Sequence, residues 1–380
     1  MILPSGRRRA LVAGGVALVI LASYVVRIRS GMTDFAVNYR AGQRLEAGET
    51  LYQIADGHYM FKYLPASALI YLPLGHLPLE AAKATWFAIS LLAAAWSFAL
   101  VRELVPAPHR HYLLAVSGLV LAKYFLHELR LGQINIMITL VMLLATRALV
   151  QNETSQDVVA GVLAGVATAL KPYAAVFFPY LLIKRNWVAV TAGVAALAIG
   201  LLVPVVFYGF QGNFRVLEEW GLTLSQSTPA LLTNNDNVSV LAFFAKWLGP
   251  STRALVAGAG VLAILALLML AVIYRGPNSR SGAVLECAML LTLVPLISPL
   301  GWDYTFLMSL LAVALVINRL DAFQRPAQVL LAFNFAVIAL AVFDLMGRRA
   351  YAAFTQWSVT TVNFIVVVAA LSYLRLRREL

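Results

Sequence analysis

Long hydrophobic blocks alternate with short polar segments along nearly the whole chain. A helix needs about 20 apolar residues to cross a bilayer, and lipid offers the backbone no other hydrogen-bond partners. The pattern therefore predicts an all-α polytopic membrane protein with about twelve transmembrane helices. The predicted segments are residues 10–26, 81–101, 112–126, 134–150, 158–170, 173–183, 187–210, 255–274, 283–297, 304–317, 327–343 and 354–374.

Some of these segments do not fit a simple upright span. Residues 158–170 and 173–183 are short and are separated by Pro172, which cannot continue a helix. They form one kinked helix or two short ones; we favour two, because a single span would turn the later basic loops outward. Residues 66–74 are expected to be a re-entrant or interfacial piece, and the first segment is expected to be a retained helix.

Polar residues gather in two long segments, 28–79 and 211–252. Because no polar stretch is long enough for a soluble domain, we expect one integral membrane domain over residues 1–380. Lys and Arg residues concentrate in the loops that would lie opposite these two segments. The positive-inside rule then places both termini in the cytoplasm and both long segments outside the inner (plasma) membrane.

Composition supports this class and excludes others. The chain is 61% hydrophobic and 12% charged, and soluble domains carry about twice that charged fraction. The net charge of +12 does not indicate nucleic acid, because the basic residues lie at helix ends and not on one face. The single cysteine, Cys287, excludes an intrachain disulfide and a cysteine-based zinc site.

Ionisable and aromatic side chains crowd the first long polar segment. Asp34 lies at its start, within a few residues of the bilayer, and is the best candidate for a catalytic group. The alternative is a solvated carboxylate beside a helix end. Tyr39 and Tyr63, in the same segment, are candidate substrate contacts.

A second polar group lies at residues 127–135, at the predicted outer end of two spans. Arg130 supplies a fixed cation there, and Glu128 is a further candidate contact. Gln133 and Asn135 offer amides to sugar hydroxyls, or they cap the start of the next helix.

Lys171 lies between two apolar segments. A lysine in such a place is costly without a partner, so a phosphate or a carboxylate would suit it. The alternative is an internal ion pair with Asp34 or Glu128.

Two later loops carry the remaining candidates. Asn235 and Asn237 belong to a loop dense in hydrogen-bonding groups, which an ordinary surface turn would also explain. Trp302 could anchor at the interface, and Asp303 could be a second carboxylate or the cap of the next helix.

Several cofactor motifs are missing from the sequence. It holds no P-loop, no dinucleotide-binding glycine motif, no His-Glu-x-x-His and no Asp-x-Asp. We therefore expect no cofactor and no dependence on a metal.

A series of short motifs follows one another in a characteristic order. They are Asp34-Phe35 with Tyr39, Ala41, Gly48 and Leu51-Tyr52; Phe61-Lys62-Tyr63-Leu64-Pro65 with Leu72-Pro73-Leu74; Leu131-Gly132-Gln133-Ile134-Asn135; Leu170-Lys171-Pro172; and Ser298-Pro299 with Trp302. This order resembles that of the family 87 glycosyltransferases, polyprenyl-phosphate-mannose-dependent α-mannosyltransferases of the C-type membrane fold. The chain departs from that family at Leu64, which is often proline, and at Asp303 and Tyr304, where a histidine often follows the tryptophan.

The resemblance implies a mechanism. A hexose, mannose in this family, would pass from a polyprenyl phosphate to an envelope glycolipid or glycan on the extracytoplasmic face. Asp34 would act as general base on the acceptor hydroxyl, which attacks C1 with inversion. Lys171 or Arg130 would neutralise the departing phosphate. The implied partners are the donor, the acceptor and the lipid bilayer, without nucleic acid.

A transporter or flippase of an anionic or lipid-linked substrate is the competing class. A basic cavity beside short helices would also suit transport. The long outer segment with an early carboxylate favours the enzyme, and no inverted repeat is visible in the sequence.

Overall fold

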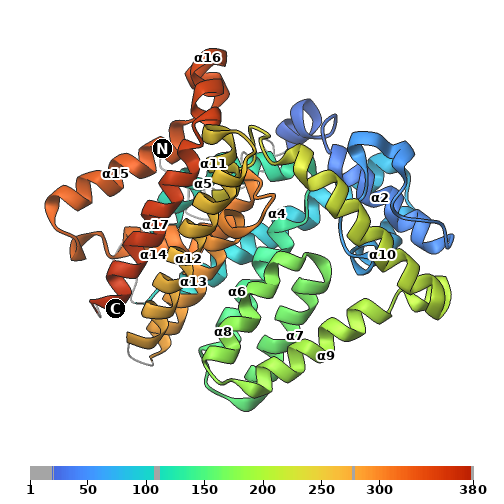
Figure 1. Cartoon of the computed structure of the whole chain (residues 1–380), viewed down its shortest axis with the longest axis horizontal. Coiled ribbons are helices and arrows are strands. Elements are labelled where there is room, and N and C mark those ends of the chain that lie inside the picture. Colours follow the sequence, from blue (N-terminus) through green and yellow to red (C-terminus); the bar gives the residue numbers. More distant parts are fainter. Residues whose placement is uncertain (1–18, 20, 107–111, 276–278, 378–380) are drawn as a thin grey trace, which may run out of the picture.

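The computed structural model describes all residues except 1–18, 20, 107–111, 276–278 and 378–380. Its regular structure is helical throughout this part of the chain, with one isolated bridge pairing Asn237 and Trp302 (Figure 1). The longer helices are α2 (Thr33–Glu46), α3 (Pro65–Gly75), α4 (Leu79–Leu104), α5 (Leu113–Leu131), α6 (Asn135–Leu149), α7 (Thr154–Leu170), α8 (Phe177–Ile183), α9 (Trp187–Leu202), α10 (Val205–Leu231), α11 (Val240–Leu248), α12 (Thr252–Arg275), α13 (Arg280–Ile297), α14 (Leu310–Asn318), α15 (Arg325–Leu340), α16 (Phe343–Gln356) and α17 (Val359–Leu376). Short helices are η1 (Tyr24–Ile28), η2 (Ile54–Tyr59), η3 (Pro172–Val176), η4 (Asp303–Ser309) and η5 (Leu320–Ala322).

The helices confirm an all-α polytopic membrane protein. Within the described residues, 4 helices are long and apolar enough to span a bilayer, or up to 6 if each sharply bent pair counts as one span. The predicted segments 134–150, 158–170, 173–183 and 304–317 form shorter apolar helices, and 112–126 lies in the 19-residue α5. Most of the segment 10–26 lies outside the described residues. The total of twelve spans therefore stays a prediction.

Two predicted segments bend where we expected straight spans. The segment 187–210 breaks after α9, and α10 leaves at 94°. Pro204 lies in this break and has no backbone N–H to continue the helix. The segment 327–343 breaks in the same way after α15, where α16 turns away by 102°. Neither α10 nor α16 therefore continues the direction of the helix before it.

The two long polar segments are themselves largely helical. Residues 66–74 form most of α3, which packs against α2. A Cβ on Gly42 would lie 2.7 Å from the carbonyl carbon of Tyr71, so glycine permits this close approach. Further along, Trp220 of α10 donates its indole N–H to the carbonyl of Lys62 at 3.2 Å. Together α2, α3 and α10 form a layer over one end of the bundle.

The break at Lys171 separates two helices, as we favoured. Helix α7 ends at Leu170, and η3 and α8 follow Pro172. Helix α7 packs closely on α9, where a Cβ on Gly161 would lie 2.1 Å from the carbonyl oxygen of Ala189. Lys171 is therefore held at the end of a tightly packed helix.

The centre of the molecule is built from α5, α13, α14 and α17. Every residue of α14 is buried. The rings of Phe306 and Phe364 stack with their centroids 3.5 Å apart, joining η4 to α17. This packed centre fixes the outer ends of the helices, where the candidate site lies.

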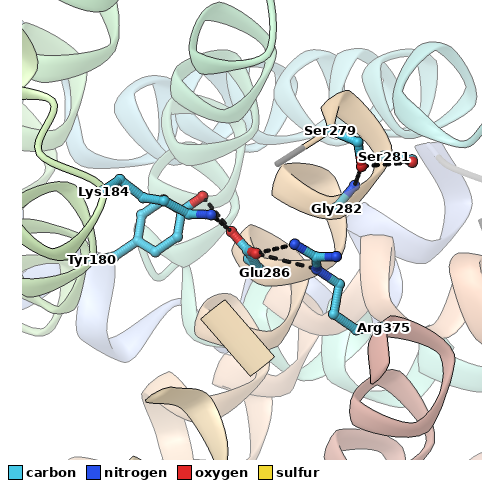
Figure 2. A network of polar contacts seen from close by, with 7 residues as sticks. All are labelled: Tyr180, Lys184, Ser279, Ser281, Gly282, Glu286 and Arg375. Carbon is cyan, nitrogen blue, oxygen red and sulfur yellow. Dashed lines mark hydrogen bonds and ion pairs between the residues drawn. The ribbon is translucent and has the colours of Figure 1, made fainter. Parts of the chain in front are cut away.

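The opposite end of the bundle is held by a buried carboxylate. Glu286 of α13 is completely buried and lies 2.7 Å from Arg375 of α17 and 2.8 Å from Lys184 after α8 (Figure 2). The hydroxyl of Tyr180 donates to the same carboxylate at 3.0 Å. These contacts join the loop after α8, helix α13 and the C-terminal helix α17 at this end of the bundle.

Candidate active site

The conformation at the start of α2 positions Asp34 in the site. Met32 precedes the helix with a left-handed backbone (φ 36°), and its N–H donates to the carbonyl of Arg130 at 2.6 Å. This bond ties the start of α2 to the end of α5. Gly132 closes α5 with φ +70°, and a Cβ there would lie 2.6 Å from that of Phe35. The turn at Gly132 thus lets the two helix ends meet.

The Gln133 amide holds Asp34 in place. Gln133 donates from Nε2 to Asp34 Oδ2 at 2.5 Å and accepts from the Tyr63 hydroxyl at 2.5 Å. Lys171 also donates to its amide oxygen, at 3.4 Å. Because lysine is only a donor, the amide oxygen must face it, which directs the NH₂ group to Asp34. The other carboxylate oxygen of Asp34 forms no hydrogen bond with any described residue.

Uncharged amide and aromatic side chains surround the ammonium of Lys171. The residue is 6% exposed, and its ammonium donates to Asn135 Oδ1 at 2.7 Å and lies 4.7 Å from the ring centre of Tyr63. The Tyr173 hydroxyl donates to the same Asn135 oxygen at 2.7 Å. Among the described residues Lys171 forms no direct ion pair, so the alternative of a pair with Asp34 or Glu128 is wrong. An amide separates it from each carboxylate.

Glu128 has a bracing role in place of the predicted substrate contact. It is fully buried, accepts from Asn135 Nδ2 at 2.7 Å and from the N–H of Ile136 at 3.2 Å. It is therefore Glu128 that satisfies the first turn of α6. The amides of Gln133 and Asn135 do not cap that helix, and both face the cluster around Lys171.

Two other predicted contacts lie outside this cluster. Tyr39 donates to the carbonyl of Leu77 at 2.8 Å and so ties α2 to the turn after α3. The side chain of Arg130 is exposed and forms no hydrogen bond or ion pair with the part of the chain described. Arg130 is thus an accessible cation beside the start of α2.

Lys62 is a second cation near Asp34 that the sequence did not single out. Burial lowers the pKa of the Lys62 ammonium, and the negative charge of Asp34 partly offsets this. Its position three residues before the start of α3 gave no signal, because the fold of the loop decides which way the side chain faces.

The late turn forms a neighbouring cluster. Asn237 is fully buried and uses its whole amide on the backbone, donating to Pro299 at 3.1 Å and accepting from Gly301 at 3.1 Å. It braces the turn, so the predicted substrate contact is corrected. Asn235 is exposed, and its carbonyl accepts from Lys246 at 3.0 Å.

His127 is the functional candidate that sequence reasoning missed. Its Nδ1 lies 3.1 Å from Asp303 Oδ1, and its ring meets Tyr304 edge-on with centroids 5.2 Å apart. Asp303 also accepts from the N–H of Tyr304 at 2.6 Å. The N-cap of η4 is Trp302 and no side chain caps this helix, so the expected capping role of Asp303 is wrong. Trp302 stacks beside Tyr304, with ring centres 6.5 Å apart.

Tyr304 is buried in the late turn, where its ring meets those of His127 and Trp302. The sequence has no histidine directly after Trp302. This absence was the signal that could have prompted a search for an imidazole on another helix. His127 supplies one from α5.

The comparison with protein families decides the class. Residues 61–299 match the sequence model of glycosyltransferase family 87. The chain belongs to glycosyltransferase family 87. The matched range begins after Asp34 and ends before Trp302, so the roles of those two residues are argued from geometry.

Other comparisons add little. No curated protein matches the chain. Two crystal structures of ArnT from Cupriavidus metallidurans are similar at 15% identity. The apo structure has a TM-score of 0.39, with 97% of this chain and 78% of that chain covered. The structure bound to undecaprenyl phosphate has a TM-score of 0.40, with 99% and 79% covered. Similarity this slight leaves the chemistry to be argued from family 87 and from the site.

As a family 87 member with a polytopic helical fold, the protein is a membrane glycosyltransferase. The described residues contain no group of three or more His, Cys, Asp or Glu side chains placed to hold a metal ion. What the site offers is a carboxylate with one free oxygen, a buried ammonium and an exposed guanidinium. These groups suit removal of a proton from a hydroxyl and neutralisation of an anionic leaving group.

Proposed function

We propose that this membrane glycosyltransferase moves mannose from a polyprenyl phosphate to an envelope glycolipid or glycan on the extracytoplasmic face, with inversion. Asp34 is the general base. The observation that carries the proposal is the Asp34 carboxylate, fixed at one oxygen by Gln133 and unbonded at the other. Family membership supplies the reaction class, and the mannose donor follows from the motif resemblance.

The reaction balances with these groups alone. The acceptor oxygen forms a bond to C1 as the bond from C1 to the phosphate oxygen breaks, and its proton passes to Asp34. The electron pair leaves with the polyprenyl phosphate, which is already a stabilised anion. One base without an acid therefore suffices. Positive charge develops at C1 and on the ring oxygen in the transition state, as in other glycosyl transfers.

Gln133 fixes the orientation of the Asp34 carboxylate. Tyr63 and Lys171 hold the Gln133 oxygen, so its NH₂ group cannot turn away from Asp34. A carboxylate held at one oxygen loses little freedom when it accepts the proton at the other. Lys171 thus acts partly through Gln133, besides placing a positive charge near the departing phosphate.

Binding of the donor phosphate is expected to depend on two cations, Arg130 and Lys171. Arg130→Met removes an exposed guanidinium, and the lost charge-assisted hydrogen bonds should weaken donor binding by roughly tenfold or more. Lys171→Met should also weaken it, and should lower the rate further because Gln133 is released. We would measure the Kd of a polyprenyl phosphate with purified variants, using Arg40→Met, which removes another exposed cation of α2, as control. Normal binding in both test variants would refute this assignment.

We also propose that the site faces away from the cytoplasm, because the basic loops gather at the opposite end of the bundle. An impermeant maleimide added outside intact cells should label Glu49→Cys and miss Arg280→Cys. Both positions are exposed, whereas the native Cys287 is buried and gives little background. The reverse pattern would place the site in the cytoplasm.

The decisive experiment is a transfer assay. Purified protein in nanodiscs is incubated with polyprenyl-phosphate mannose, extracted envelope glycolipids and EDTA. We expect mannose in a glycolipid product, with the anomeric configuration inverted relative to the donor. Intact donor after incubation would contradict the proposal. Donor that crosses a vesicle membrane without being consumed would instead indicate a flippase.

A further inference from the structure

Helix α16 (Phe343–Gln356) stands clear of the other helices at the edge of the molecule (Figure 1). It follows α15, an apolar helix of 16 residues, after a bend of 102°. At the usual rise per residue, α15 alone covers about 24 Å of the roughly 30 Å thick hydrocarbon layer of a bilayer. A bend of this size where α15 reaches the membrane surface leaves α16 close to the plane of that surface.

Hydrogen bonds hold both ends of α16 to the bundle. Lys123 of α5 donates to the carbonyl of Ala341, just before the helix, at 3.0 Å. Lys246 of α11 donates to the carbonyl of Thr355, near the end of the helix, at 3.2 Å, and to that of Asn237 at 2.8 Å. The helix is therefore fixed at both ends, while its middle is exposed.

Two exposed tryptophans lie at the C-terminal end of α16. Trp247 and Trp357 are 58% and 61% exposed, and the Trp247 indole N–H donates to the carbonyl of Trp357 at 3.2 Å. Tryptophan is enriched at membrane–water interfaces because its ring is apolar and its N–H is polar. A pair of exposed tryptophans at this place indicates that this end of α16 lies at the level of the lipid headgroups.

The middle of α16 carries unpaired positive charge. Arg348 and Arg349 are exposed, and neither forms a hydrogen bond or an ion pair with any residue that the structure describes. Asp344, one turn earlier, is the single carboxylate of the helix, so the net charge of α16 is positive. Phe343 and Leu345 are 52% and 68% exposed. Apolar side chains beside arginines are typical of helices that lie in the membrane interface.

The chemistry of these groups selects the lipid. A guanidinium forms paired, charge-assisted hydrogen bonds with a phosphate group. A zwitterionic phospholipid brings its own cation with the phosphate, whereas an anionic phospholipid leaves the negative charge of the phosphate unbalanced. Two adjacent arginines therefore complement an anionic headgroup best.

We propose that α16 lies in the membrane interface and that Arg348 and Arg349 bind the phosphate groups of anionic phospholipids. The bound headgroups hold α16 at the membrane surface, together with the loop that Lys246 fixes. This role is separate from sugar transfer, because the binding requires neither the donor nor the acceptor.

The test measures which lipids surround α16. The purified full chain carries a fluorophore on Ala350→Cys, an exposed position of α16, and is placed singly in nanodiscs; the native Cys287 is buried and gives little background. The quenchers are nitroxide-labelled phosphatidylglycerol and phosphatidylcholine, with the nitroxide near the headgroup end of one acyl chain. Half-maximal quenching should need a mole fraction of phosphatidylglycerol at least roughly fivefold lower, since one arginine near an anionic surface contributes about that factor.

The double variant Arg348→Gln, Arg349→Gln should abolish the difference between the two lipids. Arg215→Gln is the matched control, because it also removes an exposed arginine, from α10, and it should leave the preference unchanged. Asp344→Asn removes the opposing charge and should strengthen the preference. All these side chains are exposed, so the melting temperature should hold in every variant.

Three outcomes would overturn the proposal. Equal quenching by the two lipids in the labelled chain without further substitutions would show apolar contact without headgroup binding. A preference that survives the double variant, or that Arg215→Gln also abolishes, would show that other cations attract the lipid. Absence of quenching by either lipid would show that α16 extends away from the membrane.

Discussion

Asp34→Asn should lower the rate of sugar transfer by about 10²–10⁴-fold, the usual contribution of a general base. Asparagine keeps the size and planarity of the carboxylate, and its side-chain oxygen can still accept from Gln133. Only the ability to take up a proton is lost. Donor binding should therefore persist, so the loss should appear in kcat and leave the Kd of the polyprenyl phosphate nearly unchanged.

The matched control for this result is Asp303→Asn. Asp303 is the other carboxylate near Tyr304, but one of its oxygens is bonded to His127 and to the N–H of Tyr304. Its neutralisation should cost far less than that of Asp34. Near-normal turnover in Asp34→Asn, together with loss of turnover in Asp303→Asn, would show that the base is Asp303. The reaction class would survive that result.

The sequence predicts the Asp34 cluster because its parts are determined locally. Pro172 ends a helix because it lacks a backbone N–H, so the helix end at Lys171 could be foreseen. Gly132 similarly predicts a helix end, and the amides of Gln133 and Asn135 follow it directly. The structure brings them together beside Lys171.

The late turn could not be predicted in the same way. Asn237 binds the backbone of Pro299 and Gly301, and His127 meets Asp303; both pairings join distant parts of the chain. Local pattern gives no information on such contacts, because packing of the intervening helices decides them. From the sequence, the Asn237 amide was therefore expected to be available to a substrate. In the folded chain, backbone groups occupy the whole amide.

The bends after α9 and α15 show a further limit. Hydrophobicity continues through both breaks, so a count of apolar residues reads each as one span. Pro204 marks the first break in the sequence. The second, after Leu340, contains no proline, and the contact of Lys123 with the carbonyl of Ala341 at 3.0 Å forms only in the folded protein.

Glu286→Gln should lower the free energy of unfolding by about 3–5 kcal/mol, the usual cost of breaking a buried ion pair. The carboxylate is fully buried between Arg375 and Lys184 (Figure 2), and glutamine preserves its size while removing its charge. Two cations would then remain close together without their shared counter-charge.

The change in stability can be measured by denaturant unfolding in detergent, with Glu103→Gln as the matched control. Glu103 lies 2.7 Å from Arg147, but the two side chains are 45% and 44% exposed. Water screens such a pair, so its loss should cost only about 0–1 kcal/mol. Both ion pairs join different helices, and they differ in how deeply they are buried. Equal small effects would mean that water reaches Glu286 and that the cluster does not hold α8, α13 and α17 together. A large effect of Glu286→Gln alone would show that the buried cluster holds α8, α13 and α17 together.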